Sequence, residues 1–227
     1  MWLKNLLKKR KEIKYISEVR EFIFSNILDN AVGFKKDKGV NSLIRNTEYG
    51  KDYFVVSVTK IQNVYNAELF SYKKFEDLEK IYYEFTTAKK FKVESLTIGG
   101  QLGLLLDRPL PFGYKAIPNY DFWIDNLYDL EKATKKIVEL FKKTEEVFFQ
   151  KFNTYQELYE ITNNDPINMG RYDYGTYIHK ALLGTTLSKI LEDENYDTIV
   201  EIYRNKVARI LPEELSSYEG LLKKLEL

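Results

Sequence analysis

Residues 40–61, VNSLIRNTEYGKDYFVVSVTKI, decide the fold, because two stretches rich in β-branched and aromatic side chains flank the sequence YGKD at residues 49–52. This pattern predicts an antiparallel hairpin with strands over residues 40–48 and 53–61. Along residues 53–58, YFVVSV, both faces of the second strand are largely apolar. Apolar side chains on both faces are typical of a central strand that is covered on both sides.

Helical and extended patterns surround this hairpin. Before it, apolar residues recur every three or four positions over residues 2–29, with a break near residues 9–11, and Gly33 follows as a stop signal. After it, a third strand over residues 67–72 and an amphipathic helix over residues 75–86 are expected. Two further strands are expected over residues 91–98 and 102–106, on either side of Gly99-Gly100.

A connection rich in proline and glycine, residues 107–119, divides the chain into two halves of different character. Beyond it the apolar spacing is helical, and Asp129 is expected to cap the first helix. We therefore predict an α+β fold: an N-terminal helix and a small, mainly antiparallel sheet over residues 1–120, followed by a helical portion over residues 121–227 that packs on the first as a single unit. The expected helices of the second portion cover residues 130–152, 154–161, 176–191, 197–211 and 213–225.

The composition excludes several kinds of chemistry. The chain has no cysteine and a single histidine, His179, so it cannot assemble a site of several histidines or a thiolate nucleophile. The glycines at positions 99, 100 and 103 lack the Lys and Ser/Thr of a phosphate loop, and a turn or bulge is expected there. No metal site, no cofactor and no catalytic residue is identified from the sequence.

The charge and the absence of cysteine bear on partners and compartment. The formal net charge of +1 argues against a nucleic-acid partner. Six basic residues against Glu12 give residues 1–14 a charge of +5, which leaves −4 for the rest of the chain. Residues 1–16 could lie on an anionic membrane or meet nucleic acid, and the other interpretation is that they pack on their own domain or on a second subunit. No transmembrane segment or secretory leader is recognised, and we expect a cytoplasmic protein.

Residues 168–177, NMGRYDYGTY, combine aromatic rings with charges and flexible glycines, a composition typical of contact loops. The other interpretation is that these rings close the core between two helices. The oligomeric state is left open. The candidate partner-binding residues are Arg171, Tyr172, Asp173, Tyr174, Tyr177 and His179.

Four aspartates around the proline-rich connection offer an enzymatic alternative. Carboxylates that a fold brings together can act as acid and base or hold Mg²⁺. The sequence does not determine whether those between Asp107 and Asp125 converge, and Asp121 or Asp129 could instead cap local structure. The alternative is a hydrolase or transferase that uses these carboxylates.

Two long stretches resemble a known family. FSNILDNAVGFKKDKGVNSLIRNTEYGKDYFVVSV, residues 24–58, is similar to the opening of small bacterial proteins in the domain-of-unknown-function family of the DUF4304 type. LYDLEKATKKIVELFKKTEEVFFQKFNTYQELYE, residues 127–160, with a two-helix tail, is similar to their second half. The likeness covers residues 17–211 in layout. This resemblance identifies no catalytic residues. It implies a similarity to immunity proteins of bacterial toxin systems.

These observations together favour a protein that binds rather than one that catalyses. We expect a bacterial cytoplasmic binding protein without enzymatic activity, with a protein partner that resembles a toxin. An immunity protein needs a stable scaffold and a complementary surface, and it needs no active site.

Overall fold

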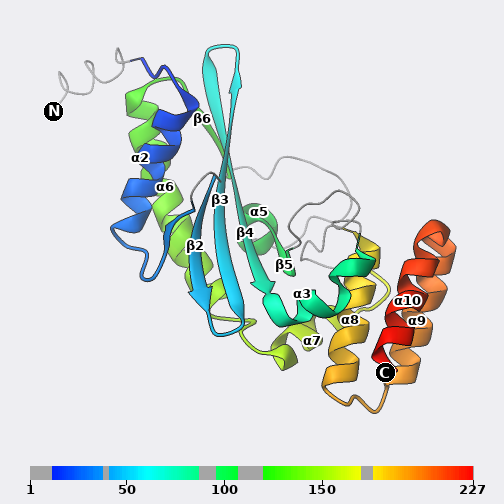
Figure 1. Cartoon of the computed structure of the whole chain (residues 1–227). Helices are drawn as coiled ribbons and strands as arrows, with labels where there is room; N and C mark the ends of the chain where they lie inside the picture. The colour runs from blue at the N-terminus through cyan, green and yellow to red at the C-terminus, as the bar shows by residue number, and fades with distance from the viewer. Residues whose placement is uncertain (1–11, 38–40, 87–95, 107–119, 170–175, 227) are drawn as a thin grey trace. The chain divides into compact units, whose positions relative to one another are not determined.

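The computed structural model describes residues 12–37, 41–86, 96–106, 120–169 and 176–226 (Figure 1). The chain forms two compact units. Unit 1 consists of Met1–Asn46, Asp52–Ser71 and Gln101–Phe148, and unit 2 of Thr47–Lys51, Tyr72–Gly100 and Phe149–Leu227. Each unit therefore combines segments from both sides of residue 120.

The strands form one mainly antiparallel sheet in the order β1-β2-β3-β4-β5, and β6 pairs with β4 off this path. Together with the helices described below, this sheet confirms the predicted α+β class. The strands are β1 (Lys35–Lys36), β2 (Ser42–Thr47), β3 (Gly50–Ile61), β4 (Val64–Phe75), β5 (Ile98–Gln101) and β6 (Asp121–Ile124).

The predicted hairpin is confirmed as β2 and β3, with a tighter turn than expected at residues 48–49. Gly50 has φ +144°, and a Cβ there would lie 2.1 Å from the carbonyl oxygen of Lys74, so only glycine suits this position. The order of strands confirms that β3 is central. Phe54 and Val56 are fully buried, whereas Val55 is only half-buried, so one face of β3 is covered more completely than the other.

In unit 1 the helices α2 (Ile16–Leu28) and α6 (Leu127–Thr144) pack against each other. The Phe141 ring of α6 meets the rings of Phe34 and Phe54 edge-on, at centroid distances of 5.3 and 5.0 Å, and so covers the buried face of β3. Residues 1–11 of the expected basic helix lie outside the described residues.

Helix α6 begins three residues earlier than predicted, which changes its cap. The side chain of Asn126 accepts hydrogen bonds from the backbone N–H groups of Tyr128 (3.0 Å) and Asp129 (3.2 Å). The prediction that Asp129 caps this helix is therefore wrong. Asp129 lies in the first turn instead, where its carboxylate accepts a hydrogen bond from Nδ2 of Asn126 at 2.8 Å. A π-helical turn, η2 (Glu145–Phe149), continues the chain beyond α6.

Two short segments around the proline-rich connection differ from prediction. Residues 102–106, expected as a strand, form the helix α5 (Leu102–Leu106), because Leu102 and Leu105 are buried at a spacing of three. A short apolar run does not distinguish a strand from a helix by its period. Residues 121–124, expected at the start of the helical portion, form β6, whose alternating burial is that of a strand.

Unit 2 is mainly helical, and its helices follow the predicted ones closely. Helix α8 is its centre: every residue from Tyr177 to Ser188 is buried. Gly184 allows this packing, because a Cβ there would lie 2.4 Å from Oδ1 of Asn163 and 2.5 Å from the hydroxyl of Tyr203. The elements are α3 (Glu76–Tyr82), η1 (Tyr83–Phe85), α7 (Tyr155–Asn163), α8 (Tyr177–Ile190), α9 (Tyr196–Ile210), η3 (Pro212–Glu214) and α10 (Leu215–Leu225).

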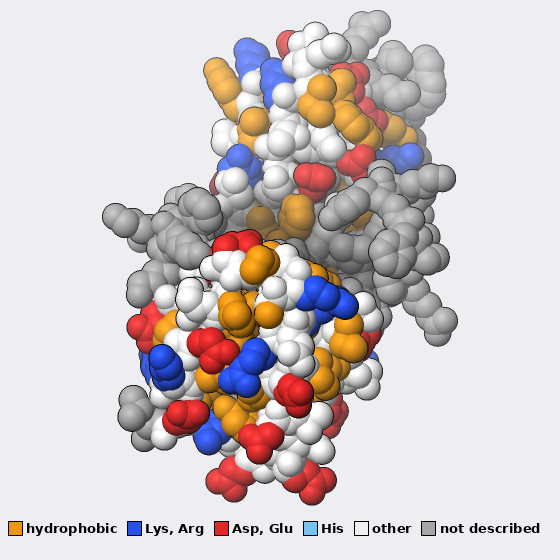
Figure 2. All heavy atoms as spheres, turned by 90° about the vertical axis from the view of Figure 1, so that its right-hand side faces the viewer, with side chains coloured by type: hydrophobic (Ala, Val, Ile, Leu, Met, Phe, Trp, Pro, Cys, Tyr) orange, Lys and Arg blue, Asp and Glu red, His pale blue; other side chains and the backbone are white. Residues whose placement is uncertain are grey.

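The surface of the C-terminal helices mixes charges of both signs. Figure 2 shows acidic and basic side chains interspersed with hydrophobic ones on the face that it presents. Arg204 on α9 and Glu219 on α10 form one such pair, with Nε 2.7 Å from Oε1. Among the described residues, no helix is both long and apolar enough to cross a membrane.

Candidate functional site

The predicted partner-binding segment ends at the first turn of α8. Arg171, Tyr172, Asp173 and Tyr174 lie outside the described residues. Thr176 caps α8, because its hydroxyl accepts a hydrogen bond from the backbone N–H of His179. Tyr177 and His179 therefore lie on a helix, and both are buried in unit 2.

Tyr177 is held by contacts within unit 2. Its hydroxyl donates a 2.5 Å hydrogen bond to the carbonyl oxygen of Pro166, and its ring lies 6.1 Å from the ring of Tyr203. Burial raises the pKa of Tyr177 far above its ordinary value, and the negative charge of Asp165 adds to this. Tyr177 therefore serves the packing of α8.

His179 joins a chain of buried polar groups. The hydroxyl of Tyr82 lies 3.2 Å from Nε2 of His179 and donates a 2.9 Å hydrogen bond to Oε1 of Glu79. The same carboxylate oxygen accepts a 2.8 Å hydrogen bond from the hydroxyl of Thr97. All four side chains are at least nine-tenths buried. A carboxylate, a phenol and an imidazole are thus linked in series.

The carboxylate of Glu79 is only partly satisfied. Its second oxygen, Oε2, is buried and has no hydrogen-bond partner among the described residues. Burial raises the pKa of Tyr82 well above its ordinary value, and the charge of Glu79 beside it adds to this effect. The phenol therefore keeps its proton and donates a hydrogen bond to Glu79, and the phenolic oxygen can accept a hydrogen bond from Nε2–H of His179.

Lys180 follows His179 and is also buried, with a relative exposure of 1%. Its ammonium donates to the carbonyl oxygens of Asp165, at 2.6 Å, and of Asn168. Burial lowers the pKa of Lys180 to about 8, although the nearby charge of Asp165 acts in the opposite direction. Lys180 therefore ties the turn after α7 to the start of α8.

The carboxylates of the enzymatic alternative are brought together only in part. Asp107 lies outside the described residues. Asp121 and Asp129 both line an open hollow of about 480 Å³, together with Lys132 and Lys136 of α6. Asp125 is exposed and is not among the residues that line it. Among the described residues, no group of three or more potential metal ligands comes together.

A surface around Trp123 was not found from the sequence. Trp123 lies on β6 and is 54% exposed, the most exposed tryptophan or phenylalanine among the described residues. Register places it opposite Asn66 of β4, and it places Asp121 opposite Glu68. We call these four residues the Trp123 surface. The alternation Asp-Phe-Trp-Ile was the signal that could have revealed it, because it puts Asp121 and Trp123 on one face.

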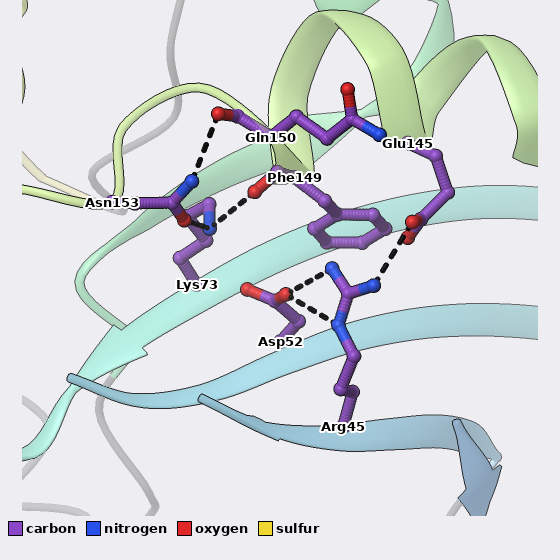
Figure 3. Close-up of polar contacts among 7 residues, drawn as sticks. All are labelled: Arg45, Asp52, Lys73, Glu145, Phe149, Gln150 and Asn153. Carbon is purple, nitrogen blue, oxygen red and sulfur yellow. Dashed lines mark hydrogen bonds and ion pairs between the residues drawn. The ribbon is translucent and has the colours of Figure 1, made fainter. Parts of the chain in front are cut away.

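Two further charged networks serve the fold (Figure 3). In unit 1, Arg45 donates to Oδ2 of Asp52 at 2.6 Å and to Oε2 of Glu145 at 2.9 Å. Burial opposes the charge of Arg45, but its pKa is raised because the two carboxylates outweigh that effect.

The second network lies in unit 2, where the Lys73 ammonium donates to the carbonyl oxygen of Phe149 (3.0 Å) and to Oδ1 of Asn153 (2.8 Å). Lys73 is 3% exposed. A buried lysine that donates to oxygens of the chain joins β4 to the segment before α7. Like the Arg45 network, it stabilises the packing of its own unit.

No protein-family model matches the chain, and no curated protein or solved structure matches it either.

Proposed function

We propose that the protein acts by binding another protein, and that the Trp123 surface contacts this partner. The observation that carries the proposal is the exposure of Trp123, at 54% of its side chain. Tryptophan is the residue type most enriched among the energetic centres of interfaces. Burial of the exposed half would remove on the order of 100 Å² from water and contribute about 3 kcal/mol.

The setting of Trp123 supports this role. Strand β6 pairs with β4 through one edge, and no strand among the described residues pairs with its other edge. A free edge can accept an extended segment of another chain. Lys132 and Lys136 line the hollow beside it, which supplies a polar rim around the aromatic centre.

In its narrower form, the proposal is a bacterial cytoplasmic protein of the immunity type that neutralises a toxin. The resemblance of residues 17–211 and the charge of −4 beyond residue 14 support this form. Residues 171–174 remain a second proposed contact stretch. Replacing Tyr172 and Tyr174 by Ala should change the melting temperature by no more than about 3 °C, while the affinity for the partner falls.

The alternative, a hydrolase or transferase, draws on the shared hollow of Asp121 and Asp129. Each carboxylate already accepts a local hydrogen bond, from Nε1 of Trp123 at 3.2 Å and from Nδ2 of Asn126 at 2.8 Å. These contacts favour the binding proposal.

Photo-crosslinking from position 123 tests the proposal. A photoreactive phenylalanine analogue is placed at residue 123 and, in a matched control, at Tyr15, another aromatic residue of unit 1 that is 63% exposed. Crosslinking in the native cell should join one protein at position 123 that is not joined at position 15.

That protein is then purified and its affinity is measured directly. Trp123→Ala should weaken binding by about tenfold or more, and Tyr15→Ala should leave the dissociation constant within about twofold. Equal crosslinks at both positions, or tight binding by Trp123→Ala, would overturn the proposal.

A further inference from the structure

We propose that the Trp123 surface binds an arginine side chain of the partner protein. This inference rests on the proposed function and adds the chemistry of the group that is recognised. Two observations carry it: a pair of like charges set opposite each other, and an exposed indole ring beside them.

The like charges lie on neighbouring strands. Glu68 of β4 is directly opposite Asp121 of β6, so two carboxylates share one face of the sheet as a cross-strand pair. Like charges at such positions repel and destabilise a sheet. Neither carboxylate forms an ion pair with any described lysine or arginine at 4.0 Å or less, so the repulsion is not relieved by the chain's own described cations.

Oxygens of the same surface have no donor. Oδ1 of Asp121 and Oδ1 of Asn66 are both buried atoms without a hydrogen-bond partner among the described residues. Because both atoms are enclosed by the protein, a donor from outside does not reach them, and the accessible acceptor of this surface is the carboxylate of Glu68. Glu68 and Asp121 thus present negative charge beside Trp123.

The indole ring is held in place by the same carboxylate. Nε1 of Trp123 donates a 3.2 Å hydrogen bond to Oδ2 of Asp121, so one edge of the indole ring is tied to the acidic pair. A guanidinium can stack on an indole face while its N–H groups reach carboxylate oxygens, because it is planar and carries five donors. An ammonium lacks both the plane and the paired donors. The arrangement therefore suits arginine better than lysine.

The lysines of the hollow do not oppose this assignment. Lys132 and Lys136 extend from α6, which packs against β6 on the side where Phe122 and Ile124 are buried. Asp121 and Trp123 alternate with these two residues but line the same hollow as the lysines, and neither lysine comes within 4.0 Å of a carboxylate oxygen of Asp121. Lys136 is also paired with Glu139, at 3.5 Å from Nζ to Oε2.

The test uses the full chain with Trp2→Phe, which leaves Trp123 as its only tryptophan. The probes are the peptide Gly-Arg-Gly-Arg-Gly and its counterparts with lysine or citrulline, followed by tryptophan fluorescence. We expect a saturable change with the arginine peptide, a dissociation constant about threefold higher with lysine, and no saturable change with citrulline, which keeps the shape but loses the charge.

A matched pair of variants removes one negative charge each. Glu68→Gln should raise the dissociation constant of the arginine peptide by about fivefold, while Glu201→Gln, at an exposed position of α9, should leave it within about 1.5-fold. Because it relieves the like-charge pair, Glu68→Gln should also raise the melting temperature. Equal losses in both variants, an equal response to citrulline, or a lower melting temperature for Glu68→Gln would overturn the inference.

The two proposals fail separately. If the arginine peptide does not bind while Trp123→Ala still weakens the purified partner, this inference is wrong and the proposed function stands. If the peptide binds as expected but the partner is insensitive to Trp123→Ala, the proposed function is wrong and the cation site remains.

Discussion

Tyr82 and His179, 97 positions apart in the chain, meet with their rings at 67° and with the phenolic oxygen 3.2 Å from Nε2. This contact joins α3 to α8 in unit 2. Because Tyr82 also donates to Glu79, the loss of one hydroxyl would leave two buried polar groups without their shared partner.

Replacing Tyr82 by Phe should therefore lower the free energy of unfolding by about 1–3 kcal/mol, since the ring volume is kept and only the hydroxyl is lost. Urea titration measures the change. Tyr15→Phe, at a position that is 63% exposed, is the control and should have no measurable effect. A stability equal to that of the control would mean that the Glu79–Tyr82–His179 chain contributes nothing to the fold.

The depressed pKa of Lys180 predicts a pH-dependent stability. The folded state releases the proton near pH 8, whereas the unfolded chain holds it up to about 10.5, so the unfolded state binds more protons between these values. The free energy of unfolding should therefore rise with pH from about 8 to 10, with a slope of at most about 1.4 kcal/mol per pH unit from this group.

Lys180→Met removes that contribution, and the difference in stability between wild type and variant should grow with pH over this range. The window ends at pH 10 because Tyr177, buried and with a raised pKa, keeps its proton where unfolded tyrosines begin to lose theirs. A difference that stays constant between pH 8 and 10 would show that Lys180 is charged in the folded protein throughout.

Arg45, Asp52 and Glu145 form a group of three paired charges in unit 1. The effects of mutating Arg45 and Asp52 on stability should therefore not be additive. Arg45→Met leaves Asp52, which is 1% exposed, as a buried charge without its main counter-ion, and this should cost about 3–5 kcal/mol. Adding Asp52→Asn should recover a large part of the loss, because the uncompensated charge is then removed. If the double variant is as unstable as the sum of the single ones, the two residues are not energetically coupled.

Adding a single methyl group at Gly184 should strongly destabilise the fold. Gly184→Ala would bring a methyl group to 2.5 Å from the hydroxyl of Tyr203, which donates a 2.7 Å hydrogen bond to Oδ1 of Asn163. We expect a loss of about 1–3 kcal/mol from overpacking. Thermal unfolding measures it, and the double variant Gly184→Ala/Tyr203→Phe should be less destabilised than additivity predicts, because the hydroxyl that meets the methyl is gone.

The sequence predicts those parts of the fold in which a long periodic pattern decides the structure. Helix α6 is such a case, since Leu130, Ile137 and Phe141 recur on one buried stripe over several turns. Strand β3 is another, because its β-branched and aromatic residues follow a turn signal, whereas only residues 67–72 of β4 were predicted as a strand. Strand β6 has four residues and helix α5 has five. Segments this short do not establish a hydrophobic period, and the nearby prolines indicate a loop instead.

The candidate sites were less predictable because they depend on pairings between distant segments. In the sequence, Glu79 is indistinguishable from the other polar residues of an amphipathic helix. Only the fold brings it to Tyr82 and Thr97, and through Tyr82 to His179. Likewise the cross-strand pair of Glu68 and Asp121 follows from a register that no local pattern encodes. His179 was singled out for its rarity, and its burial could not be foreseen from that.

Helix α8 has no solvent-facing side from Tyr177 to Ser188, and a methyl group already finds no room at Gly184. Each side chain of this buried stretch is surrounded by its neighbours, so few replacements would leave the unit intact. In proteins that have diverged from this one, the string YIHKALLGTTLS should accordingly change more slowly than the surface around Trp123, and it offers the best probe for recognising them.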